Sequence, residues 1–162
     1  MRSISFAVLA SCALGISSAA FAAGGGGGGG MESTPPKAVD PNFSQAKAMI
    51  EARNYAPALP LLQQVVARDP KNADAYNLLG YATRKSGNPN GSLQYYNQAL
   101  QIDPKHLGAH EYVGEAYLML DQPQQAEQHL ARLNSLCVFG CTEYRMLKAA
   151  IADYKAGKKP TN

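Results

Sequence analysis

The sequence has no strong excess of charge of either sign. Fifteen Lys and Arg residues stand against twelve Asp and Glu residues, and the formal net charge is +3 at pH 7. A nucleic-acid-binding domain usually carries a basic stripe or patch, whereas the basic cluster here is Lys155, Lys158 and Lys159 near the end of the chain. We expect residues 157–162 to be a solvated basic tail, and we expect no nucleic-acid partner.

Motifs of familiar catalytic sites are missing as well. The chain has no G-x-S-x-G, no H-E-x-x-H and no Walker sequence, which are patterns that place a nucleophile, a zinc ion or a nucleotide phosphate. Its acidic residues are scattered, and no two of them stand out as an acid and base pair. The sequence therefore predicts that the protein is not an enzyme and that it holds no cofactor and no metal ion.

One long apolar run is present, and it lies at the amino terminus. Arg2 precedes this run, which ends in Ala20-Phe21-Ala22-Ala23. A basic start, an apolar middle and small residues at the end are typical of a secretory signal peptide. We expect residues 1–22 to be removed and the protein to be exported, to the periplasm of a bacterium.

A second route of processing stays open at Cys12. Leu9-Ala10-Ser11-Cys12 resembles a bacterial lipobox, which would lipidate Cys12 and hold the protein at the outer membrane. The apolar run before Cys12 is short for a signal peptide, and cleavage there would leave further apolar sequence on the mature chain. We therefore expect membrane attachment only if Cys12 is lipidated.

Residues 23–41 are rich in glycine and proline. Gly24 to Gly30 is a run of seven glycines, which is flexible and has no side chains to bury. No predicted strand precedes this run and no predicted helix opens from it, so we reject a phosphate-binding glycine loop. We expect a disordered tether over these residues.

The rest of the chain repeats with a period of 34 residues. A shift of that length aligns Leu79-Gly80 with Val113-Gly114, and Asp69-Pro70 with Asp103-Pro104. This period is typical of helix-turn-helix repeats. Apolar residues at helical spacing, broken by Gly and Pro, predict helices over 42–53, 56–68, 73–86, 89–102, 106–120, 123–136 and 142–156.

The repeated positions resemble the pattern of the tetratricopeptide repeat (TPR) family. Its residues appear most fully in the second repeat, 73–106, as Tyr76, Leu79, Gly80, Tyr96, Ala99 and Pro104. The repeats over 39–72 and 107–140 match less fully, with His110 in place of an aromatic residue and Val138 in place of Pro. The resemblance implies an all-α domain over 42–156, a right-handed superhelix of three repeats closed by a capping helix at 142–156.

The resemblance also implies where a partner would bind. In this family the first helix of each repeat lines a concave groove that holds a protein or peptide, and the groove positions here are Lys47, Asn77, Tyr81, Arg84, Lys85, Glu111 and Glu115. We expect a cationic strip on the second repeat that accepts carboxylate or carbonyl groups of an extended peptide. Glu111 and Glu115 are expected to accept a basic side chain.

These positions predict a scaffold that holds other proteins, in a bacterial envelope complex. A plain solvated face is the alternative interpretation of the groove residues. Self-association is another, because the end faces of a short repeat array can stack between chains to form a homo-oligomer.

Two cysteines, Cys137 and Cys141, lie at a predicted turn before the capping helix. In an oxidising compartment such a pair forms a disulfide, which would fasten the capping helix to the third repeat. A thiol-redox pair or a two-thiolate metal site stays open, and either would make the chain a periplasmic metal- or thiol-handling protein. His106 and His110 have the spacing of a helical metal pair, but we expect packed or surface histidines, with His129 alone on an outer helix.

Overall fold

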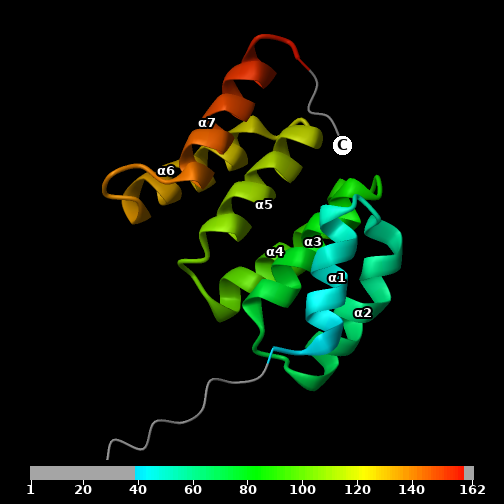
Figure 1. Cartoon of the computed structure of the whole chain (residues 1–162). Coiled ribbons are helices and arrows are strands. Elements are labelled where there is room, and N and C mark those ends of the chain that lie inside the picture. The colour runs from blue at the N-terminus through cyan, green and yellow to red at the C-terminus, as the bar shows by residue number, and fades with distance from the viewer. Residues whose placement is uncertain (1–38, 159–162) are drawn as a thin grey trace, which may run out of the picture. The chain divides into compact units, whose positions relative to one another are not determined.

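The structure is a computed structural model that describes residues 39–158. The predicted signal peptide, Cys12, most of the predicted tether and residues 159–162 lie outside the described residues. The described part contains seven helices and no strand (Figure 1): α1 Pro41–Glu51, α2 Tyr55–Arg68, α3 Ala73–Lys85, α4 Pro89–Ile102, α5 Leu107–Met119, α6 Pro123–Leu136 and α7 Thr142–Lys155. Each predicted helix agrees with the observed bounds to within two residues, which confirms the all-α fold class.

Polar side chains fix where several helices begin. Asn72 and Asn88 accept hydrogen bonds from backbone amides three residues later, at 2.9 and 2.8 Å. Asp40 caps α1 by accepting a hydrogen bond from the amide of Asn42, two residues later, and also pairs with Arg68 at the end of α2, with a shortest contact of 2.8 Å. Because Asp40 and Pro41 already belong to the start of α1, the folded part begins within the range 23–41 predicted as tether.

The helices pair into three hairpins, α1–α2, α3–α4 and α5–α6, and α7 packs against both α5 and α6. The first helices of successive hairpins also touch, since α1 packs on α3, α3 on α5 and α5 on α7. The second helices α2, α4 and α6 do not pack on one another within the described residues. The first helices therefore lie closer together and form one continuous face, which we call the inner face.

Two glycines allow helices to approach closely. A methyl group on Gly80 of α3 would lie 2.5 Å from Cε1 of Tyr96, whose side chain is fully buried on α4. A methyl group on Gly114 of α5 would lie 2.6 Å from Cδ2 of Leu147, a fully buried residue of α7. Gly80 and Gly114 occupy equivalent repeat positions, so glycine at this position allows α4 to pack closely on α3 and α7 to pack closely on α5.

Candidate functional site

A row of tyrosines connects α2, α3 and α5. The ring of Tyr81 on α3 lies between those of Tyr55, at the start of α2, and Tyr112 on α5, with centroid distances of 6.0 and 4.8 Å. Tyr81 and Tyr112 are half-buried, so each keeps part of its ring available to solvent. Burial raises the pKa of the Tyr112 hydroxyl to about 12, which keeps the hydroxyl protonated and able to donate a hydrogen bond.

Arg84 lies beneath this row and is only 2% exposed. Its guanidinium forms an ion pair with Glu115 at 2.6 Å and donates a hydrogen bond to the Tyr96 hydroxyl at 3.4 Å. The guanidinium carbon also lies 5.5 Å from the ring centroid of Tyr81 and 5.9 Å from that of Tyr112. Its charge is thus already matched inside the protein, which differs from the open cationic strip that the sequence predicts.

The two lysines of the predicted site lie nearer the surface. Lys85 is half-buried beside Tyr81, with its Nζ 5.8 Å from the ring centroid. Burial, with a smaller contribution from Arg84, lowers the pKa of Lys85. Lys47 on α1 is exposed. Lys47, Tyr81 and Lys85 are therefore residues of the predicted site that a partner can reach directly.

The remaining predicted residues, Asn77 and Glu111, are buried. They expose only 7% and 3% of their surface, and neither Asn77 Oδ1 nor Glu111 Oε1 accepts a hydrogen bond from the described residues. Burial, with smaller contributions from the nearby carboxylates of Glu115 and Glu143, raises the pKa of Glu111 to about 8, although Arg84 acts to lower it. Repeat position alone does not reveal this burial, because it depends on packing between helices.

Two histidines meet between α5 and α6. His110 and His129 face each other with their Nδ1 atoms 2.9 Å apart, so the expectation that His129 stands alone was wrong. The other ring nitrogen of His110 lies 3.2 Å from the carbonyl oxygen of Pro104. His106 does not join them, because its Nδ1 caps α5 and its Nε2 contacts Asp74.

We expect this histidine pair to weaken the fold at acid pH. Burial, with a smaller contribution from His110, lowers the pKa of His129 to about 4, below the value of about 6.5 for an unfolded chain. The unfolded state therefore binds more protons, and stability falls as the pH drops from 6.5 toward 4, by about 2 kcal/mol. Urea unfolding at pH 7 and 4.5 measures this loss, and His129→Leu should show a smaller one. Equal losses in the two proteins would contradict this assignment.

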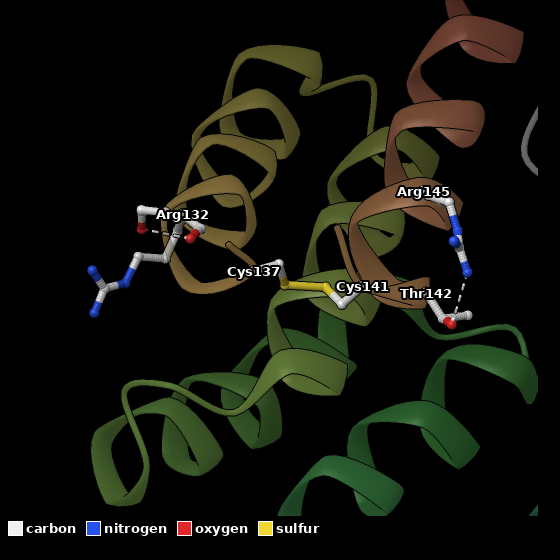
Figure 2. Close-up of a disulfide and its surroundings, with 6 residues drawn as sticks. Arg132, Cys137, Cys141, Thr142 and Arg145 are labelled. Carbon is white, nitrogen blue, oxygen red and sulfur yellow. Dashed lines mark hydrogen bonds between the residues drawn. A yellow bond between two sulfur atoms is a disulfide. The ribbon is translucent and has the colours of Figure 1, made fainter. Parts of the chain in front are cut away.

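Cys137 and Cys141 form a disulfide that closes the turn between α6 and α7, with an S–S distance of 2.11 Å (Figure 2). At the tip of this turn, Val138 is 83% exposed and Phe139 is 99% exposed. The aligned turns after α2 and α4 carry Asp-Pro-Lys instead, so an apolar tip belongs to this turn alone among the three. No sequence motif predicts this exposed apolar pair.

Removing this disulfide should loosen the attachment of α7. In the entropy model, cross-linking a loop of this length raises the free energy of the unfolded chain by about 2 kcal/mol, because it removes conformations from that state. We expect a Cys137→Ser, Cys141→Ser variant to unfold at lower urea concentration, and a reducing agent to have the same effect on the native protein. If the reducing agent changes only the native protein and not the variant, the effect belongs to this bond. An unchanged native protein would contradict the expectation.

The described residues contain no group of three or more His, Cys, Asp and Glu side chains placed to hold a metal ion. Within 39–158, no helix combines the length and apolar character needed to cross a membrane. What the structure does bring together is a set of aromatic and charged side chains supplied by α2, α3 and α5.

Stacked helix hairpins of 34 residues, with small residues at the close contacts, define a helical repeat protein. Family models described as tetratricopeptide repeat match residues 43–106 and 83–151. The chain belongs to the tetratricopeptide repeat family, as the sequence resemblance predicts.

Curated relatives share only the repeat region with this chain. The human protein O-mannosyl-transferase TMTC3 is 30% identical over 76 residues, which is 47% of this chain and 8% of that protein. The Arabidopsis thaliana TPR repeat-containing thioredoxin TTL4 is 28% identical over 82 residues, which is 51% of this chain and 12% of that protein. The chain thus spans a small part of the length of the curated relatives it matches.

Solved structures show similar helical stacks. MamA 41-end from Desulfovibrio magneticus RS-1 is 26% identical with a TM-score of 0.57, over 59% of this chain and 54% of that one. The Yersinia enterocolitica type III secretion translocator chaperone SycD is 17% identical with a TM-score of 0.62, over 72% of this chain and 87% of that one. The likeness to SycD concerns the fold alone.

Proposed function

We propose that this protein is an exported scaffold that binds another protein through its inner face, in a bacterial envelope complex. The observation that carries the proposal is the solvent-accessible part of the tyrosine row together with Lys85, which come from α2, α3 and α5. Partly exposed aromatic rings beside a cation are typical of binding hot spots. Protein binding is the ordinary use of this family, and SycD, a chaperone, gives an example within the same fold.

The exposure of each side chain supports a narrower set of proposed partner contacts. Tyr81 and Lys85 are accessible, whereas Arg84 supports them from below through its contacts with Tyr81 and Tyr112. An extended peptide lying across α3 could stack on Tyr81 and accept a hydrogen bond from Lys85 through a carboxylate or carbonyl oxygen.

Affinity capture from an envelope extract tests the proposal. The baits are residues 39–158, a Tyr81→Ala, Lys85→Ala variant, and a control variant with Asn97→Ala and Gln101→Ala, which are exposed on α4. Arg84 stays unchanged in all of them because its loss is expected to destabilise the domain. We expect a partner that the native domain and the α4 variant retain and that the inner-face variant loses. A partner lost only with the α4 variant would contradict the proposal.

The proposed export has its own test. Mass spectrometry of the protein purified from its host should find a mature chain that begins at Ala23, as cleavage after residue 22 predicts. A mature chain that begins with a lipidated Cys12 would replace the soluble periplasmic location with a membrane anchor. A chain that still begins at Met1 would contradict export.

A further inference from the structure

Two buried hydrogen-bond acceptors on neighbouring helices lack a donor. Asn77 Oδ1 on α3 and Glu111 Oε1 on α5 belong to side chains that are more than nine-tenths buried, and no described group donates to either atom. Buried polar atoms are nearly always paired in native proteins, because leaving one unpaired costs about 1–3 kcal/mol. Two such acceptors on packed helices are open to a donor that the described residues do not supply.

The two side chains lie along the same junction of the inner face. A methyl group on Gly108 would lie 3.3 Å from Nδ2 of Asn77, so the amide of Asn77 borders the first turn of α5. Glu111 follows Gly108 by three residues, and residues at this spacing share one side of a helix. The acceptors therefore come from the packed pair α3 and α5, next to the half-buried ring of Tyr112.

Acidic groups outnumber basic groups around Glu111. The guanidinium of Arg84 is the cation that reaches it from α3, and that charge is already paired with Glu115 at 2.6 Å. Glu115 on the same helix and Glu143 on α7 are both acids that act on Glu111. The region thus holds more carboxyl groups than cations, and a positive charge from a ligand would restore the balance.

We propose that this junction binds a cationic side chain, an arginine or lysine of the protein partner, with Glu111 and Asn77 as its hydrogen-bond acceptors. The inference rests on the proposed function of the inner face. It adds which kind of partner side chain would bind at the third repeat. Arginine and lysine have donors only and carry the missing charge. A tyrosine ring beside the site adds attraction for a cation.

Binding should be linked to the release of a proton. Burial keeps the pKa of free Glu111 at about 8, so its carboxyl group is mostly protonated at pH 7. A bound cation favours the carboxylate and lowers this pKa. Arg84 of α3, Glu115 of α5 and Glu143 of α7 face the group and set its starting value. The affinity for a cation should therefore rise as the pH increases from 6 to 8.

NMR on the purified protein tests the site with a defined probe. The carboxyl carbon of Glu111 is followed against pH, alone and with N-acetyl-argininamide, and the neutral analogue N-acetyl-citrullinamide is the matched ligand control. We expect the arginine probe to lower the midpoint of Glu111 by one unit or more and to shift the side-chain amide of Asn77. The citrulline analogue should do neither. Glu111→Gln should weaken binding of the arginine probe at least tenfold, whereas Glu51→Gln, an exposed change on α1, should leave it unchanged.

The outcomes separate this inference from the proposed function. No effect of the arginine probe on native Glu111, or an equal effect on Glu111→Gln, would overturn the cation site. If a partner is still captured through Tyr81 and Lys85 in that case, the scaffold function stands without it. If the arginine probe binds at Glu111 but no captured protein depends on Tyr81 and Lys85, the cation site stands and the proposed scaffold function falls.

Discussion

Arg84→Ala is expected to destabilise the domain by about 3 kcal/mol. Arg84 is 2% exposed, and its removal would leave Glu115 without its ion-pair partner and the Tyr96 hydroxyl without its hydrogen bond. It would also open a space beneath the rings of Tyr81 and Tyr112. Breaking one partner of a buried pair is strongly destabilising because the other charge stays behind.

Urea unfolding of Arg84→Ala beside Lys85→Ala measures this effect. The two residues are sequence neighbours of the same charge, yet Lys85 is half-buried and makes one long contact with the ring of Tyr81. We expect Lys85→Ala to stay within about 0.5 kcal/mol of the native protein, as is usual for a surface change. Equal unfolding midpoints for the two variants would contradict the structural role of Arg84.

Gly80→Ala is expected to destabilise the protein by about 2 kcal/mol, although alanine is ordinarily the better helix former. The added methyl group would lie 2.5 Å from Cε1 of Tyr96, and that ring is fully buried and has no room to move aside. The overpacking outweighs the helix propensity of about 1 kcal/mol that alanine would otherwise contribute.

Gly108→Ala is the matched control for this prediction. Its added methyl group would meet nothing closer than Nδ2 of Asn77 at 3.3 Å, so we expect equal or higher stability. Thermal unfolding measures the stability of both variants relative to the native protein. A gain in stability for Gly80→Ala would show that α3 and α4 are not held as closely as the structure has them.

The fold was predictable because its signals are local and repeated. The period of 34 residues, the helical spacing of apolar residues and the Gly-Asn-Pro break at 87–89 mark the helices without any knowledge of their packing. The structure places the start of α1 only slightly earlier than predicted, since Asp40 accepts the hydrogen bond from Asn42 at 2.8 Å.

The candidate site was predictable only as a set of positions. The sequence identifies Arg84 and Glu115 as groove residues, but their pairing depends on the distance between α3 and α5. The contact between His110 and His129 joins two helices, and no sequence motif predicts it. The burial of Glu111 has the same origin, because burial is a property of the stacked repeats and not of one helix.

The most direct test of the scaffold account is site-specific photo-crosslinking in the living host. A photoreactive phenylalanine analogue replaces Tyr81 on the inner face or, as the control, Asn97 on the exposed side of α4. The account predicts a discrete adduct with another protein from position 81 and none from position 97. An adduct from position 97 with none from position 81 would contradict binding through the inner face.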